Sequence, residues 1–197
     1  DMSIFKRHEE TRWYLIIVAV AITIIVITNY FWETHSSMVN VIFDVTTIIT
    51  TTGFIVGDYD TWPVFSKQMI MLLMVVGGCS RSTAGGLITS RMLLWIRSMK
   101  NEIIRGFRPN VVLKLQMNGT AVDDQVIRSV YVVTSIAVFF FVGGTMVITL
   151  LEPQLDVITC ASAVLSSICN IGPAFSELGP TQNYSILSAP SLGVLSI

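Results

Sequence analysis

The longest apolar stretches of the chain predict two membrane-spanning helices. Residues 13–32, WYLIIVAVAITIIVITNYFW, contain no charged side chain. About 20 helical residues span a hydrocarbon core of roughly 30 Å, and the aromatic residues at both ends are typical of membrane interfaces. Residues 126–151 have the same character, with Arg128 near their start.

Two shorter apolar stretches predict helices that enter the membrane and return. In residues 38–54, Asn40 and Asp44 interrupt the apolar pattern, and TTTGF follows. Threonine favours strands, but an isolated strand between spanning helices would leave unpaired backbone groups in lipid. We therefore expect a short helix and a return loop. Residues 155–175, LDVITCASAVLSSICNIGPAF, repeat this order, and we align Gly172 with Gly53.

Residues 63–96 are too long for one span, and their middle is unsuited to a helix. The stretch GGCSRSTAGG, residues 77–86, contains four glycines, each costing about 1 kcal/mol in a helix interior relative to alanine. We predict two half-helices, 63–76 and 87–97, around a loop within the membrane. Residues 184–197 then predict the start of a further spanning helix, kinked by Pro190.

Composition and charge agree with an all-α integral membrane protein. The chain is 52% hydrophobic and 13% charged, whereas soluble domains carry roughly 25% charge. Lysine and arginine concentrate in residues 1–12 and in a connector, residues 98–125, which places both in the cytoplasm by the positive-inside rule. The three cysteines have neither disulfide nor metal-site spacing, and we expect no nucleic-acid partner.

The two return loops have the chemistry of a cation site. A dehydrated monovalent cation in a bilayer needs oxygen ligands, and backbone carbonyls supply them without a trapping full charge. Small, hydroxyl-bearing and glycine residues, such as those of TTTG, let successive carbonyls face one axis. The carbonyl end of the preceding helix also favours a cation. An acidic outer rim would raise the local cation concentration.

Three motifs in order resemble the Trk/Ktr/HKT superfamily of potassium transporters: TTTGFIVGDYDTWP, GGCSRSTAGGL and CNIGPAF. The resemblance covers nearly the whole chain. It implies four span–pore-helix–return-loop–span repeats around a central pore, of which residues 13–97 and 126–197 match the third and fourth. We therefore expect the chain to be part of a larger protein in the plasma (inner) membrane.

The resemblance also implies roles for individual residues. The selectivity filter would include Thr51, Thr52, Gly53, Phe54, Asn170, Ile171, Gly172 and Pro173, with K⁺ held at Thr51, Thr52, Asn170 and Ile171 and no covalently bound cofactor. The intramembrane gate would include Gly77, Gly78, Ser80, Arg81, Ser82, Thr83, Gly85 and Gly86. The implied partners are membrane lipid, the N-terminal half of the same pore, a second copy in a homodimer, and a cytoplasmic nucleotide-binding regulatory subunit.

Arg81 departs from the family pattern, which has a small residue at this place. An arginine at membrane depth is costly and indicates a function by default. It could pair with a carboxylate of the missing half, face the pore as a positive barrier, or inactivate this copy.

Four functions therefore compete. Potassium uptake leads, and a sodium-selective or sodium-coupled relative is the nearest alternative. A non-conducting scaffold closed by Arg81 is the third. An intramembrane enzyme is disfavoured because no nucleophile–base set or metal motif is present in the spans.

Overall fold

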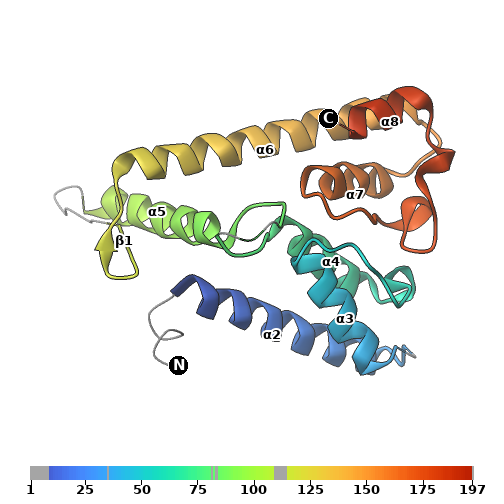
Figure 1. The fold of residues 1–197 in the computed structure, drawn as a ribbon, viewed down its shortest axis with the longest axis horizontal. Helices are drawn as coiled ribbons and strands as arrows, with labels where there is room; N and C mark the ends of the chain where they lie inside the picture. The colour runs from blue at the N-terminus through green and yellow to red at the C-terminus, as the bar shows by residue number, and fades with distance from the viewer. Residues whose placement is uncertain (1–8, 35, 81, 83, 109–114, 197) are drawn as a thin grey trace.

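The computed structural model describes residues 9–34, 36–80, 82, 84–108 and 115–196, and it is mostly helical (Figure 1). Its long helices are α2 (Glu9–Phe31), α5 (Thr89–Phe107) and α6 (Asp124–Leu151). Its shorter α-helices are α3 (Met38–Ile49), α4 (Val64–Val75), α7 (Val157–Ile168) and α8 (Ala189–Leu195). Three 3-10 turns, η1 (Tyr59–Thr61), η2 (Ser176–Leu178) and η3 (Tyr184–Ile186), lie in the connections.

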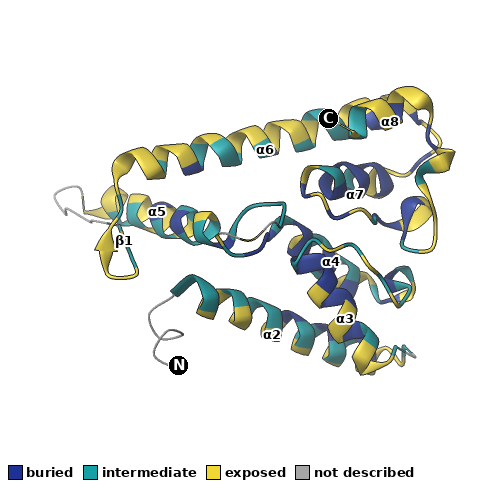
Figure 2. Cartoon of the chain, in the orientation of Figure 1, coloured by how far each residue is buried: buried dark blue, intermediate teal, exposed yellow. Residues whose placement is uncertain are grey.

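Two of the described helices are long and apolar enough to cross a membrane, α2 with 23 residues and α6 with 28. At 1.5 Å per residue, each exceeds the roughly 30 Å hydrocarbon core. Large apolar side chains on α6 are exposed, for example Phe139 at 73% and Leu150 at 81%, as expected of a surface that faces lipid or another membrane segment. Figure 2 shows that most of α6 is exposed along its length.

The buried residues concentrate around the two short helices α3 and α7 (Figure 2). One apolar cluster joins α2, α3 and α4 to residues that follow α7, including Cys169, Ile171 and Phe175. A second cluster joins α6 and α7, with Ile148 and Ala163 fully buried. Both short helices therefore bury one face against the longer helices, while side chains such as Val39 of α3 and Ile158 of α7 remain exposed.

A buried asparagine shows how a polar residue is accommodated inside this apolar packing. Asn29 of α2 is 3% exposed. Its Oδ1 accepts a hydrogen bond from the Ser66 hydroxyl of α4 at 2.8 Å, and its Nδ2 donates to the Ser36 hydroxyl at 2.9 Å. A buried polar group is costly only when it lacks partners, so Asn29 fixes α4 against α2 without that penalty.

The structure differs from the sequence-based expectation in three places. Helix α5 runs without a break from the predicted half-helix of residues 87–97 into the connector and ends at Phe107; we expected the connector to be partly helical, but not continuous with the half-helix. The connector also contains a hairpin of β1 (Gln116–Met117) and β2 (Thr120–Ala121), so the fold is mostly rather than wholly helical. Asn118 and Gly119 have φ values of 54° and 78°, the conformation of a type I′ hairpin turn.

The third difference concerns Pro190. It lies in the first turn of α8, where the missing N–H of proline has no intrahelical partner in any case. We had expected Pro190 to kink this helix; it lies instead in its first turn, where it favours the start of the helix.

The four-glycine stretch agrees with the expectation that it is not continuous helix. Helix α4 ends at Val75 and α5 begins at Thr89.

Candidate functional site

The first return loop begins where α3 ends. Thr50 is the last residue with helical φ and ψ, and Thr51 then adopts a left-handed conformation with φ 53°. The Thr51 N–H donates to the Ile48 carbonyl at 3.0 Å, and the Thr52 N–H donates to the Thr47 carbonyl at 2.9 Å. Gly53, with φ 79°, turns the chain away from the helix axis. A left-handed conformation costs L-residues roughly 1–2 kcal/mol, so this loop is held by its surroundings.

The second return loop has the same backbone as the first. Helices α3 and α7 each have 12 residues. Asn170, like Thr51, is the second residue after its helix and also has φ 53°. The Asn170 N–H donates to Ser167 at 3.1 Å and the Ile171 N–H to Ser166 at 2.9 Å. Gly172 follows with φ 111°, so the alignment of Gly53 with Gly172 describes two loops of matching conformation despite their different sequences.

The two return loops meet at Gly53. A Cβ placed on Gly53 would lie 2.1 Å from the Ile171 carbonyl oxygen and 3.7 Å from the Pro173 ring. No larger residue fits here unless one loop moves. A Cβ on Gly172 would meet no atom of the described residues within 4 Å. The two glycines thus share a backbone conformation but differ in their surroundings.

A third loop, residues 76–88, contacts both return loops. The Gly85 N–H donates to the Thr51 hydroxyl at 3.0 Å. A Cβ on Gly85 would lie 2.0 Å from the Cys169 carbonyl oxygen. The two ends of the third loop are joined as a parallel bridge between Val76 and Leu87. One glycine therefore lies between the first residues of both return loops.

The ends of the third loop are fastened by a few hydrogen bonds. The Gly77 N–H donates to Leu87 at 2.9 Å, and the Thr89 hydroxyl donates to the Gly77 carbonyl at 2.9 Å. The middle is tied to the start of α2, because the Ser80 N–H donates to a carboxylate oxygen of Glu10. Ser80 and Ser90 also share a hydrogen bond at 2.6 Å. Hydrogen bonds therefore hold the two ends of the third loop together and attach its middle, at Ser80, to Glu10 of α2.

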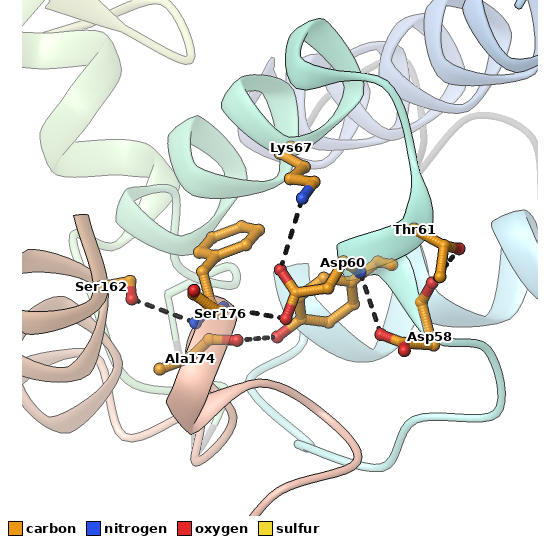
Figure 3. Close-up of polar contacts among 9 residues, drawn as sticks. Asp58, Asp60, Thr61, Lys67, Ser162, Ala174 and Ser176 are labelled. Carbon is orange, nitrogen blue, oxygen red and sulfur yellow. Dashed lines mark hydrogen bonds and ion pairs between the residues drawn. The ribbon is translucent and has the colours of Figure 1, made fainter. Parts of the chain in front are cut away.

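A cluster of polar contacts joins the segments that follow the two return loops (Figure 3). Tyr59 is fully buried, and its hydroxyl donates to the Ala174 carbonyl at 2.7 Å. The Tyr59 ring packs edge-on against Phe175 with centroids 5.1 Å apart. Asp60 accepts the Ser176 N–H at 2.8 Å and lies 3.7 Å from the Lys67 ammonium.

Burial raises the pKa of Asp60, and the Ser176 N–H and the Lys67 charge partly offset this effect. Figure 3 shows the Asp60 side chain between Lys67 and Ser176. Tyr59 and Asp60 of η1 therefore bind the segment that follows the second return loop on the side opposite α7 (Figure 3).

The start of α2 also contacts the hairpin. Arg97 of α5 forms an ion pair with Glu9 at 2.8 Å and donates to the Gln116 carbonyl at 2.7 Å. The Glu9 N–H donates to the Asn118 side chain at 3.0 Å. Because Glu10 holds Ser80, one turn of α2 joins the hairpin, α5 and the third loop.

Several of the site residues predicted from the sequence lie at this meeting point. Thr51, Gly53, Ile171 and Gly85 make the closest approaches between the three loops. Phe54 is 71% exposed and lies outside the contact. Arg81 and Thr83 fall outside the described residues.

Several residues that support the loops were not predicted from the sequence. Tyr59 and Asp60 lie in the motif we quoted, yet nothing in the sequence indicated which distant backbone they bind. Ser162 supports the second loop, because its hydroxyl accepts the Phe175 N–H at 3.0 Å. Asp44 is fully buried and accepts the Val56 N–H at 3.1 Å; a carboxylate within an apolar helix was the available signal.

The arrangement offers backbone oxygens, and not a cluster of charged ligands. Among the described residues, no group of three or more His, Cys, Asp or Glu side chains could hold a metal ion. Two helices long and apolar enough to cross a membrane, and two short helices that end in loops of matching backbone, are the arrangement expected of a multi-pass membrane protein. The chain belongs to the TrkH family, described as cation transport protein, whose model matches residues 2–188. This family is not one of enzymes.

Named relatives agree with the family. The Trk system potassium uptake protein TrkH of Halomonas elongata is 29% identical over 88% of this chain, and TrkG of Escherichia coli K12 is 28% identical over 96%. The crystal structure of the potassium transporter TrkH from Vibrio parahaemolyticus matches 96% of the chain with a TM-score of 0.85 at 23% identity, which shows the fold. The match covers 36% and 37% of the two relatives and 40% of the crystallised chain, so the chain spans about two fifths of their length.

Proposed function

We propose that this chain forms part of the pore of a potassium-uptake protein in the plasma membrane. The observation that carries the proposal is the contact at Gly53 between two return loops of matching backbone. In this proposal the chain supplies two of four span–pore-helix–return-loop–span repeats, residues 13–97 and 126–197. The names of the relatives, all Trk potassium uptake proteins, support potassium as the cargo.

The filter residues of this proposal are Thr51–Phe54 of the first loop and Asn170–Pro173 of the second. Helices α3 and α7 both end at these loops, so the negative ends of two helix dipoles lie next to the proposed K⁺ site. Carbonyl oxygens of Thr51, Thr52, Asn170 and Ile171 would replace part of the hydration shell of the ion. Two quarters of a filter cannot surround an ion, so conduction requires the whole protein.

The loop of residues 76–88 is the gate in this proposal. It contacts both return loops through Gly85, so a displacement of this loop changes the space next to the filter. Its tip is tied to Glu10, and the adjacent Glu9 contacts Arg97 and Asn118. This chain of contacts offers a route by which a cytoplasmic nucleotide-binding subunit, docked on the connector, could move the gate. We also propose that the whole protein is a homodimer.

Potassium uptake by the full-length protein in cells that lack their own uptake systems tests this function. The cells should grow at low external K⁺, and excess Na⁺ should not abolish uptake. Uptake of Na⁺ in preference to K⁺ would indicate the sodium-selective alternative. Normal amounts of protein in the membrane with no flux of either ion would indicate a non-conducting scaffold and refute the proposal.

A further inference from the structure

We propose that the Asp44 carboxylate braces the first return loop and also sets how tightly the proposed filter holds its cation. This inference rests on the proposed function, and it assigns a positioning and specificity-determining role to a residue outside the filter itself. Asp44 is the seventh residue of α3 and is fully buried. It lies on the helix that leads into the loop, and not in the loop.

The bracing contact is direct. The Val56 N–H donates to Oδ1 of Asp44 at 3.1 Å. Oδ2 faces Gly57, where an added Cβ would lie 2.9 Å from this oxygen. Asp44 therefore holds the two residues that lead out of the return loop against the side of α3, and Gly57 provides the room that the carboxylate needs.

The second return loop is braced at the same place by a neutral group. Val56 and Phe175 each follow the loop glycine by three residues. The Phe175 N–H donates to the Ser162 hydroxyl of α7 at 3.0 Å. The seventh residue of α7, at the position that corresponds to Asp44, is Ala163. A hydroxyl is thus sufficient to hold this backbone, and the charge of Asp44 is not needed for bracing alone.

The carboxylate is also incompletely paired. Oδ2 is buried and has no donor of full hydrogen-bond geometry within the part of the chain that the structure describes, although the Gly57 backbone N–H also interacts with the carboxylate. A buried, half-paired carboxylate is costly, so a serine would be the less costly brace. A nearby cation would offset that cost, because it is attracted to the unpaired negative charge.

The Asp44 carboxylate lies at a suitable distance from the proposed cation site to strengthen cation binding. Asp44 precedes the end of α3 at Ile49 by five residues, about 7.5 Å along the helix axis. A monovalent cation about 10 Å from the carboxylate, at an effective dielectric constant near 20, would bind roughly tenfold more tightly than without the charge. The charge is close enough to strengthen binding and far enough from the ion not to trap it.

Potassium-uptake kinetics of Asp44→Asn in the full-length protein test the inference. Asparagine keeps an oxygen for the Val56 N–H and removes the charge. We expect KM for K⁺ to rise about tenfold while the maximal rate and the amount of protein at the surface stay within twofold. Asp44→Ser, which replaces the carboxylate with a neutral hydroxyl, should raise KM to the same degree.

A matched control separates the position of the charge from its mere presence. Asp58→Asn removes one charge from the less buried part of the same segment. It should leave KM within twofold of the unaltered protein. A rise in KM equal to that of the Asp44 variants overturns the inference.

The other possible results with the Asp44 variants and the unaltered protein also test the inference. Unchanged KM in both Asp44 variants overturns the inference while leaving the proposed function intact. Failure of both variants to reach the membrane would show that Asp44 is purely structural, which also overturns it. Absence of uptake by the unaltered protein refutes the proposed function, and the inference falls with it.

Discussion

Gly85→Ala should move the proposed gate away from the second return loop. In the structure a Cβ on Gly85 would lie 2.0 Å from the Cys169 carbonyl oxygen and 2.7 Å from its carbon. Ordinary van der Waals contact begins near 3.4 Å, so these atoms must separate by about 1.4 Å. The obstacle is backbone, which cannot rotate aside as the end of a side chain can.

The free-energy cost of Gly85→Ala in the observed loop position has two sources, the clash with the Cys169 backbone and the loss of the hydrogen bond to Thr51. Forcing a methyl group into a packed site costs about 1–3 kcal/mol. Loss of the Gly85 N–H bond to the Thr51 hydroxyl costs about 0.5–1.5 kcal/mol more. The observed loop position is then disfavoured by about 1.5–4.5 kcal/mol, which corresponds to a roughly 10-fold to 2,000-fold shift toward other positions at 1.36 kcal/mol per tenfold.

The assay is K⁺ and Na⁺ flux of the full-length protein at equal surface expression, with and without its regulatory partner. If the observed position closes the path, flux without the partner should rise and the K⁺/Na⁺ ratio should persist. Gly106→Ala is the matched control, because a Cβ at Gly106 meets no atom of the described residues within 4 Å. Unchanged flux in Gly85→Ala would refute the gate assignment. A changed K⁺/Na⁺ ratio would show that the filter had moved instead.

Four further predictions concern other parts of the site. Gly53→Ser should weaken the preference for K⁺ over Na⁺ more than Gly172→Ser, since only Gly53 abuts the other loop; equal effects on flux ratios would contradict this. Tyr59→Phe loses a buried hydrogen bond and should lower stability by about 1 kcal/mol, measured as a lower thermal midpoint in detergent. Glu152→Gln should flatten the acid side of the midpoint–pH profile between about pH 4.5 and 2, because hydrogen bonds lower the pKa of Glu152 to about 2 and their stabilisation is lost as pH falls. Arg81→Gly should raise flux at equal expression if Arg81 obstructs the path, whereas reduced expression would indicate a lost ion pair.

The sign of the Glu152 effect comes from its contacts. One carboxylate oxygen accepts the Ser188 N–H at 2.7 Å and the Ser191 hydroxyl at 2.8 Å. Hydrogen bonds from Ser188 and Ser191 favour the ionised form, so the folded protein binds the proton more weakly than the unfolded chain. The stabilisation is therefore fully present above the unfolded pKa near 4.5 and disappears as the pH approaches 2.

The secondary structure was predictable where one local rule decided it. Length and hydrophobicity predicted the spanning helices α2 and α6, and the four glycines predicted the interruption between α4 and α5. The half-helix predicted to end at residue 97 continues without a break into the connector, as far as Phe107. Charged residues continue the helix there, since Lys, Arg and Glu are good helix formers, and hydrophobicity alone does not mark such an end.

The pairing of the loops was less predictable, because it depends on long-range contacts. The sequence indicated that Gly53 and Gly172 occupy equivalent positions, but not that Gly53 lies against the Ile171 carbonyl and Gly172 does not. The Tyr59 hydroxyl reaches Ala174 across 115 residues, and no periodicity in the sequence reports such a contact. The resemblance to the superfamily implied a gate role for Gly85, but the sequence did not indicate that a side chain there would meet the Cys169 backbone.

The two return loops show why equal backbones do not imply equal function. Each loop has a residue in the left-handed conformation, Thr51 or Asn170, and a glycine with positive φ two residues later. Backbone conformation alone would therefore make the two halves of the proposed site equivalent. Their supports differ: a buried carboxylate holds the first loop and a hydroxyl holds the second. The third loop adds a further difference, since it donates a hydrogen bond to Thr51 but presses on the Cys169 backbone. A displacement of the third loop therefore changes the two halves unequally, and selectivity and gating need not be governed by the same half.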